Sequence, residues 1–382
     1  MTAINNTTTI QVDNTNRPNT TILLQDTPTP SPALLARLTS HLPYSLPLLR
    51  RLQFADKFKG GRTDETHVLY ARLGRHPGVD GSASGDDHDG NGDGVETGHF
   101  AAAYVDLSQG PETQVWVYSS LEPDAAGGDR DSSDELYSWA KPGSEGGEGR
   151  VRSALEEEAL DLALALFRRI RTIAAGGAGG SSPANATSAP SPAPVLAGTV
   201  HEVLRHGLLA RGVRLLKPSG IIAERDWEVC GKWLFRVEDI PTVAKDNHGL
   251  PEGMRWDRVW PSDIDVARSR TNIKRRVETM LKLPGMVVRL ENEAPAAWAF
   301  LGLDGSLMVH VEEAYRQLGL ARLLVSKLMV EHIADFSDDG WGTADVFTGN
   351  YQSQGLCRKI GGKNTWALSW ALVDVTTVGD AV

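Results

Sequence analysis

Stretches with a regular apolar period alternate along the chain with stretches that contain few apolar residues. In the first half, apolar residues recur at helical spacing around 34–42 and again around 155–170. The run Val195–Leu209 predicts a short strand that leads into a helix. Strand-like runs also occur at 66–73, 99–107 and 113–120. Helix and strand therefore interleave in this half, which is typical of an α/β or α+β domain.

The second half shows a clearer pattern. Apolar spacing predicts one helix over 262–282, with Ser262 as its N-cap and Pro284-Gly285 as its end. Asp304-Gly305 is a strong signal for a hairpin turn between two strands. The other expected elements are strands at 286–290, 297–303 and 307–311, a helix at 318–334, a strand at 344–347, a helix at 352–360 and a strand at 365–373.

Four tracts consist mostly of small and polar residues. They span 1–31, 76–98, 122–149 and 174–194. Such compositions bury too little apolar surface to offset the entropy of ordering, so they predict disorder. In the second tract, Asp87–Asp93 resembles the start of a calcium-binding loop, but Gly98 stands where that loop needs a bidentate glutamate. We therefore predict no metal site.

Composition narrows the class of protein. The chain has 382 residues, of which 41% are hydrophobic, enough to form a sizeable core. Its net charge of −10 argues against nucleic-acid binding, which needs a broad basic face. A signal-peptide pattern and a long apolar run are both missing, so we expect no membrane contact and a cytoplasmic location, with a nuclear one left open. The two cysteines, Cys230 and Cys357, form neither a disulfide framework nor a zinc site.

One segment has the chemistry of an anion-binding turn. The strand Leu307–Val311 leads into Arg316-Gln317-Leu318-Gly319-Leu320-Ala321, where a long amphipathic helix begins. Free N–H groups in the first turn of a helix, together with its dipole, favour a phosphate. The small Gly319 and Ala321 allow close approach, and Arg316 and Arg322 add positive charge. The segment lacks the Gly-Lys-Ser/Thr of a Walker A loop and the three glycines of a dinucleotide fingerprint. An ordinary strand–turn–helix remains the alternative.

The pattern Arg-x-x-Gly-x-Ala between a strand and a helix resembles the acyl-CoA-binding motif of the GNAT superfamily of N-acyltransferases. Downstream, Asn350, a short helix and Lys359–Gly362 follow in the order common in that superfamily. Upstream, the Trp-containing segment Pro295–Phe300 and the pair Tyr315-Arg316 resemble the glycine N-acyltransferase-like branch. The resemblance covers roughly 255–373.

This resemblance implies a GNAT-type α/β (α+β) fold, with a mixed, mostly antiparallel sheet flanked by helices. The segment Leu42–Leu49 resembles the opening of the same branch, which implies a tandem of a degenerate N-terminal half and a catalytic C-terminal half. The expected organisation is a disordered tail at 1–31, an N-terminal half with insertions at 32–254, and an acyl-CoA-binding domain at 255–382.

The resemblance also implies an activity: direct transfer of an acyl group from acyl-CoA, with acetyl-CoA expected, to the amine of a small molecule or amino acid in a ternary complex. Backbone groups near Val309 and Val311 would pair with the pantetheine arm. The N–H groups from Gln317 to Arg322 would hold the pyrophosphate, and Asn350 belongs to the same predicted site. Two alternatives stay open: a catalytically inactive acyl-CoA-binding scaffold, and a protein or peptide N-acetyltransferase.

The base and the acid are predicted from strand geometry and from the family pattern. Alternation along the strand places His310 on the face opposite Val309 and Val311, and an imidazole suits proton removal near neutral pH. A partly exposed structural histidine is the alternative. Cys357 stands where the family often has a tyrosine that protonates the leaving thiolate; a packed cysteine, with water as the acid, is the alternative. The other candidate bases are Glu291, Glu293, Glu312 and Glu313.

Overall fold

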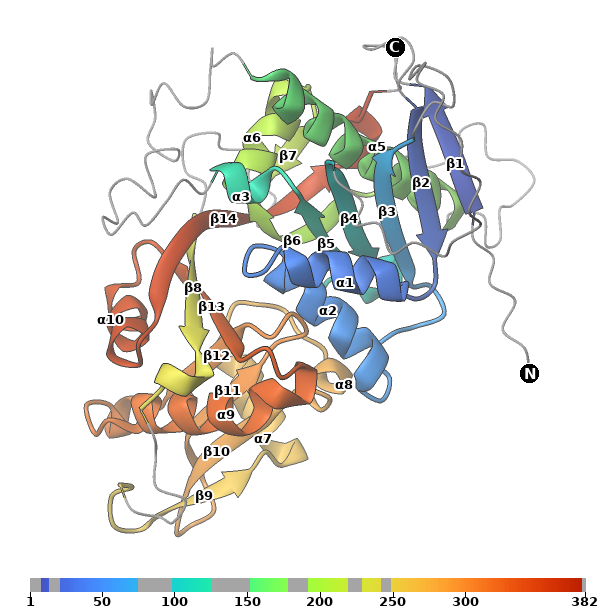
Figure 1. The fold of residues 1–382 in the computed structure, drawn as a ribbon. Coiled ribbons are helices and arrows are strands. Elements are labelled where there is room, and N and C mark those ends of the chain that lie inside the picture. Colours follow the sequence, from blue (N-terminus) through green and yellow to red (C-terminus); the bar gives the residue numbers. More distant parts are fainter. Residues whose placement is uncertain are drawn as a thin grey trace, which may run out of the picture.

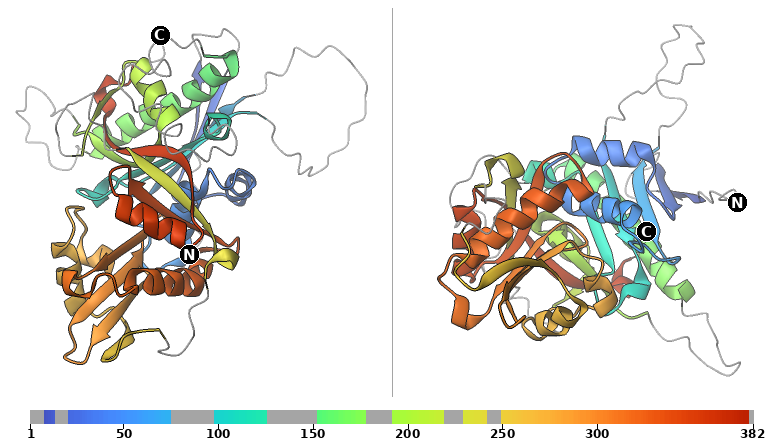
Figure 2. Two further views of the ribbon diagram at one scale, coloured as in Figure 1. Left: turned by 90° about the vertical axis from the view of Figure 1, so that its left-hand side faces the viewer. Right: turned by 90° about the horizontal axis from the view of Figure 1, so that it is seen from below.

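The computed structural model describes residues 8–13, 21–74, 98–125, 152–177, 192–218, 229–241 and 249–379. These residues form two halves that lie one above the other in Figure 1, with β14 (Lys363–Asp374) and β8 (Cys230–Arg236) running between them. Figure 2 shows the same two strands crossing from one half to the other in a second view. No helix in the described part of the chain is long and apolar enough to span a membrane.

The first half is built on a mostly antiparallel sheet with helices on both faces. The helix α5 packs on one face of the sheet, and α1 and α2 pack on the other. Its elements are β1 (Thr8–Asp13), β2 (Thr21–Thr27), α1 (Pro32–Ser40), α2 (Leu46–Lys57), β3 (His67–Leu73), β4 (Phe100–Val105), β5 (Val115–Ser119), α3 (Glu122–Ala125), α5 (Ala154–Gly177), β6 (Val195–His201), α6 (Glu202–Ala210) and β7 (Arg214–Leu216).

Local chemistry accounts for these elements. Every residue of β4 is buried, as expected for a central strand that is covered on both faces. The helix α1 begins with Ser31 as N-cap, whose hydroxyl accepts a hydrogen bond from Leu34 N–H at 3.1 Å, and Pro32 occupies the first helical position.

The second half contains a four-stranded antiparallel sheet in the order β12-β11-β10-β9. The helix α9 packs on β10, β11 and β12. Its elements are β9 (Met254–Arg258), α7 (Pro261–Ser269), α8 (Val277–Met280), β10 (Gly285–Leu290), β11 (Pro295–Leu301), β12 (Leu307–Val311), α9 (Leu320–Phe336), β13 (Trp341–Phe347) and α10 (Tyr351–Lys359), followed by β14.

The order of elements repeats between the halves. Apart from the short α3, a helix pair, three antiparallel strands, a helix, a strand, a helix and a strand occur first as α1 to β7 and then as α7 to β14. In the first half, β5 pairs in parallel with β6 at Val115↔Ala197. In the second half, the corresponding strands β12 and β13 meet in parallel at Ser306↔Thr343. The fold is therefore a tandem of two GNAT-type halves, as the sequence predicts.

Two strands are shared between the halves. The first part of β14, Lys363–Leu368, pairs with β8, and its second part, Leu368–Asp374, pairs with β6 and β7. The strand β8 in turn lies between β14 and β13. In the described part of the chain, β8 therefore pairs only with strands that follow residue 254, although it precedes the proposed boundary there and belongs to the same long sheet as the strands of the first half.

Two sequence predictions need correction. The predicted tail 1–31 contains β1 and β2, and Ile22 and Leu24 of β2 alternate into the core because β2 pairs with β3. The predicted helix 262–282 is two helices: α7 ends at Ser269, and α8 begins at Val277. Glu112 of the first half accepts hydrogen bonds from Arg276 N–H and Nε, both at 2.9 Å, and this holds Arg276 in an extended conformation. The calcium-like segment Asp87–Asp93 lies outside the described residues.

Candidate active site

The strands β12 and β13 meet at one point and then part. Their single parallel bridge joins Ser306 to Thr343, and beyond it the two strands belong to different sheets. On the opposite side of β12, Glu312 N–H donates to Ala296 O at 3.0 Å, so the even-numbered residues of β12 bond to β11. The backbone groups of Val309 and Val311 therefore point toward the opening between the strands.

The turn after β12 presents free donors. Gln317 and Gly319 both have positive φ, 66° and 77°, and Gly319 is the N-cap of the 17-residue helix α9. Within the described residues, the backbone N–H groups from Gln317 to Arg322 have no hydrogen-bond acceptor. Arg316 Nε donates to Val311 O at 3.3 Å. A Cβ added to Gly319 would meet open space. The turn is thus an exposed, positively polarised helix terminus beside the opening.

The two faces of the four-stranded sheet are covered by different helices. Lys327 of α9 lies 5.6 Å from the ring centroid of Trp256, which shares a face with Val311 through the strand register. Arg289 forms an ion pair of 2.7 Å with Asp263 of α7, so α7 covers the other face. His310 lies on the α7 face, opposite the face that α9 covers.

His310 is positioned by an aromatic neighbour. It is the cross-strand partner of Trp298, and the two rings stack with centroids 4.7 Å apart and planes inclined by 22°. Its Nε2 is buried and has no hydrogen-bond partner among the described residues. Burial lowers the pKa of His310; Glu312 raises it, and Arg316 and Arg270 lower it further. The ring is therefore neutral at pH 7 and able to accept a proton.

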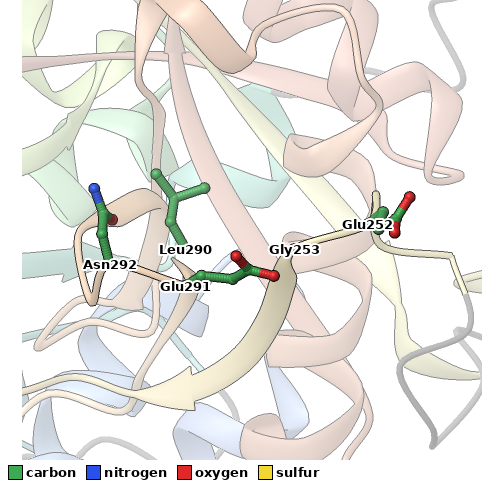
Figure 3. Close-up of a pocket in the computed structure, with 5 residues that line it drawn as sticks. All are labelled: Glu252, Gly253, Leu290, Glu291 and Asn292. Carbon is green, nitrogen blue, oxygen red and sulfur yellow. The ribbon is translucent and has the colours of Figure 1, made fainter.

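The other candidate bases have ordinary structural partners or lie on the surface. Glu312 pairs with Arg270 at 2.9 Å, and Glu293 pairs with Arg255. Glu313 is exposed in the short helical turn after β12. Figure 3 shows Glu291 in a hollow between the start of β9 and the β10–β11 turn. The five residues that line this hollow are Glu252, Gly253, Leu290, Glu291 and Asn292. Because its charged side chains are carboxylates, the hollow does not suit an anionic cofactor.

Cys357 and Asn350 both belong to α10. The thiol of Cys357 is buried in the core of the second half, and burial raises its pKa to about 12, partly offset by Arg358. The thiol is therefore protonated at neutral pH. Asn350 is the N-cap of α10, and its side-chain oxygen accepts a hydrogen bond from Ser353 N–H at 3.0 Å. Both residues thus have a structural role, and their roles toward a substrate stay predictions.

One buried charged pair was not predicted from the sequence. Lys232 of β8 and Asp345 of β13 are cross-strand partners, and Lys232 Nζ lies 2.5 Å from Asp345 Oδ1. The available signal was a charged residue in the interior of each of two mostly apolar strands, Lys232 in Cys230–Arg236 and Asp345 in Trp341–Phe347. Charged residues are almost never fully buried unless they are paired.

Comparison with known proteins agrees with this fold. The element order and the strand–turn–helix define a GNAT-type fold. A family model described as the N-terminal domain of the acyl-CoA N-acyltransferase verG matches residues 19–233, more than half of the chain. The chain therefore belongs to this family of acyl-CoA N-acyltransferases. The matched region ends in β8, before the strand–turn–helix begins.

Solved structures resemble the fold at low sequence identity. A Drosophila protein is 12% identical, with 90% of this chain and 97% of that chain covered and a TM-score of 0.50. A tandem GNAT protein from the clavulanic acid biosynthesis pathway is 10% identical, with 92% and 98% covered and a TM-score of 0.43. No curated protein matches the sequence closely enough to count as a relative.

Proposed function

We propose that the chain transfers an acyl group from acyl-CoA, with acetyl-CoA as the expected donor, to the amine of a small molecule or amino acid. The supporting observation is a pair of neighbouring stretches with open backbone groups, one on β12 and one at the start of α9. The edge of β12 at Val309 and Val311 faces away from β11, although Val311 O accepts a hydrogen bond from Arg316 Nε, and the free N–H groups of Gln317 to Arg322 follow after one short helical turn. A pantetheine arm can form strand-like hydrogen bonds with the first part, and a pyrophosphate can accept hydrogen bonds from the second.

In this proposal the protein positions two substrates and manages protons. Arg316 and Arg322 contribute positive charge beside the pyrophosphate. His310 is the proton acceptor, because it lies on the β12 face opposite α9 and its lowered pKa keeps it neutral. Cys357 is the candidate donor to the departing thiolate, and its raised pKa keeps it in the protonated form that a donor requires. Asn350 fixes the start of α10 beside the end of β13.

The first test is binding of the donor. Calorimetric titration with acetyl-CoA, desulfo-CoA and a longer acyl-CoA would measure affinity and acyl-chain preference. Thiol release with a panel of primary amines, amino acids and basic peptides would then identify the class of acceptor. Binding followed by turnover of small amines supports the proposal. Binding with no turnover of any acceptor favours an acyl-CoA-binding scaffold, turnover of peptides alone favours a peptide acetyltransferase, and failure to bind any acyl-CoA contradicts the proposal.

A further inference from the structure

Several buried polar atoms without hydrogen-bond partners gather where β12 and β13 part. Within the described residues, they include Nζ of Lys232, Oγ1 of Thr343 and both carboxylate oxygens of Asp345. Lys232 and Asp345 contact each other in an ion pair of 2.5 Å, which leaves Oδ2 of Asp345 and Oγ1 of Thr343 without a hydrogen-bond partner among the described residues. Buried polar groups in proteins are nearly always hydrogen-bonded, so an unsatisfied set of this kind calls for the polar atoms of water or of a ligand.

These atoms lie on the same side of the fold as His310. In the parallel bridge, Ser306 and Thr343 point to the same side, and alternation places His310 and Asp345 on that side too. The helix α9 lies on the other side, where a Cβ added to Gly342 would meet Met329 Sδ at 3.3 Å. Asp345 therefore faces away from α9, toward the side where His310 is proposed to meet the acceptor.

The surroundings of Asp345 raise the pKa of its carboxyl group toward neutral pH. Burial raises its pKa to about 6; Lys232 lowers it, and Asp304 of the β11–β12 hairpin raises it. Two other groups face the pair. Glu122 of α3 lies near Lys232, and burial raises the pKa of its carboxyl group well above the ordinary value. Cys357 of α10 lies near Asp345. A carboxylate whose pKa is near the working pH is an efficient proton acceptor.

We propose that Asp345 receives the ammonium group of the acceptor and takes its first proton. This inference rests on the proposed function and adds a second proton acceptor to the same site. The ammonium ion gives one proton to the Asp345 carboxylate and becomes a neutral amine. Its nitrogen forms a bond to the thioester carbon, and His310 takes the second proton from that nitrogen. The carbon–sulfur bond breaks, and the leaving thiolate takes a proton from Cys357, which regains one from solvent. Asp345 and His310 return their two protons to solvent, so one proton is released per turnover.

A purely structural role for the pair makes a different prediction. If Lys232 and Asp345 only hold β8 against β13, a variant should affect every acceptor equally. If Asp345 takes a proton, the variant should lose turnover only with acceptors that bind as ammonium ions. Hydroxylamine is a weak base that is mostly unprotonated at neutral pH, whereas alkylamines and amino acids arrive as ammonium ions. This pair of acceptors therefore separates the two roles.

The test uses the full chain with Asp345→Asn. Its turnover with the best alkylamine or amino acid from the acceptor screen should fall by about 100-fold or more, the usual contribution of a general base. Its turnover with hydroxylamine and its affinity for acetyl-CoA should change by less than about threefold, because neither requires the proton transfer. An equal fall with both acceptors, or no fall with either, overturns the inference.

A second variant guards against misfolding. Asp345→Asn leaves the Lys232 ammonium buried and unpaired, which is strongly destabilising, whereas removing both charges is often neutral. The double variant Lys232→Met, Asp345→Asn should therefore unfold at a temperature near that of the parent and show the same selective loss. If the parent itself binds no acyl-CoA and acylates neither acceptor, the proposed function fails together with the inference. If the parent acylates both the alkylamine and hydroxylamine, the proposed function holds, and the variants test the role of Asp345 alone.

Discussion

The imidazole of His310 lies against the indole of Trp298, with ring centroids 4.7 Å apart and planes inclined by 22°. The two residues are direct partners across β11 and β12, so the stacking follows from the strand register. The indole is 5% exposed and shields one face of the imidazole from water. Because desolvation disfavours the charged form, this contact helps to keep the ring neutral. The acid–base behaviour of the site therefore depends on a sheet register as well as on a motif.

The pH dependence of acyl transfer should report on His310. The acid-side loss of kcat/KM should reflect both proposed proton acceptors, His310 with a pKa below 6.5 and Asp345 with a pKa of about 6, so His310 is tested by changing a charge that acts on it alone. Glu312→Gln removes a negative charge that raises the pKa of His310. It also leaves the positive charge of Arg270, which lowers that pKa, without its ion-pair partner. Both changes therefore move the acid-side midpoint to lower pH. The measurement is kcat/KM against pH. Glu313→Gln, at an exposed neighbouring position, should leave the midpoint unchanged, and an equal shift in both variants would contradict the assignment.

Charge at the turn before α9 should decide donor binding. Gly319→Glu places a carboxylate in open space beside the free N–H groups, where it should repel the pyrophosphate and weaken acyl-CoA binding at least tenfold. Gly319→Gln is the matched control, because it carries the same strain of positive φ, about 1 kcal/mol, without the charge. Calorimetric titration with acetyl-CoA measures the affinity of both variants. Equal affinity in the two variants would mean that the pyrophosphate lies elsewhere.

An ion pair between the halves should contribute to stability in a pH-dependent way. The fully buried Arg50 of α2 pairs with Asp339, which precedes β13, and also donates to Trp341 O at 2.9 Å. Asp339→Ala leaves Arg50 buried without its partner, so we expect a loss of about 3 kcal/mol in the free energy of unfolding at pH 7. Urea denaturation measures this loss, and Asp338→Ala, at an exposed neighbour, should cost less than about 0.5 kcal/mol.

The sign of the pH effect follows from the pKa of Asp339. Burial would raise that pKa, but the hydrogen bond and charge of Arg50 outweigh burial, so the pKa in the folded state lies below the ordinary 3.8. The stabilisation is therefore present above pH 3.8 and is lost as the pH falls through the lower folded-state value. The difference between the parent and Asp339→Ala should shrink below pH 3.8. A difference that stays constant from pH 7 to pH 3 would argue against the ion pair as its source.

The shared strand β8 should be required for the second half to fold. A fragment 249–382 lacks the strand that lies between β13 and β14, so both would lose a hydrogen-bonded neighbour along with the buried Trp233 and Phe235. We expect this fragment to show no cooperative unfolding transition, whereas a fragment 229–382 should show one. Circular dichroism during thermal unfolding distinguishes the two. Matching cooperative transitions would support an independent domain that starts after residue 254.

The sequence alone determined the elements that depend on neighbours in the chain. The strand Leu307–Val311 has the predicted bounds, the turn at Asp304-Gly305 forms, and α9 begins two residues after its predicted start. Apolar period, turn residues and a glycine with positive φ are local properties, so a sequence displays them directly. The GNAT-type fold followed from several such local pieces occurring in the right order.

Only the tertiary structure decided which distant segments meet. The strand β2 joins the core because β3 pairs with it, and the predicted long helix is divided because Glu112 binds Arg276 from the other half. Lys232 meets Asp345 because β8 pairs with β13, and β12 parts from β13 because the two strands belong to different sheets beyond the bridge of Ser306 and Thr343. Strand pairing and burial depend on partners that can be more than a hundred residues away, and the local sequence pattern of neither partner records the contact.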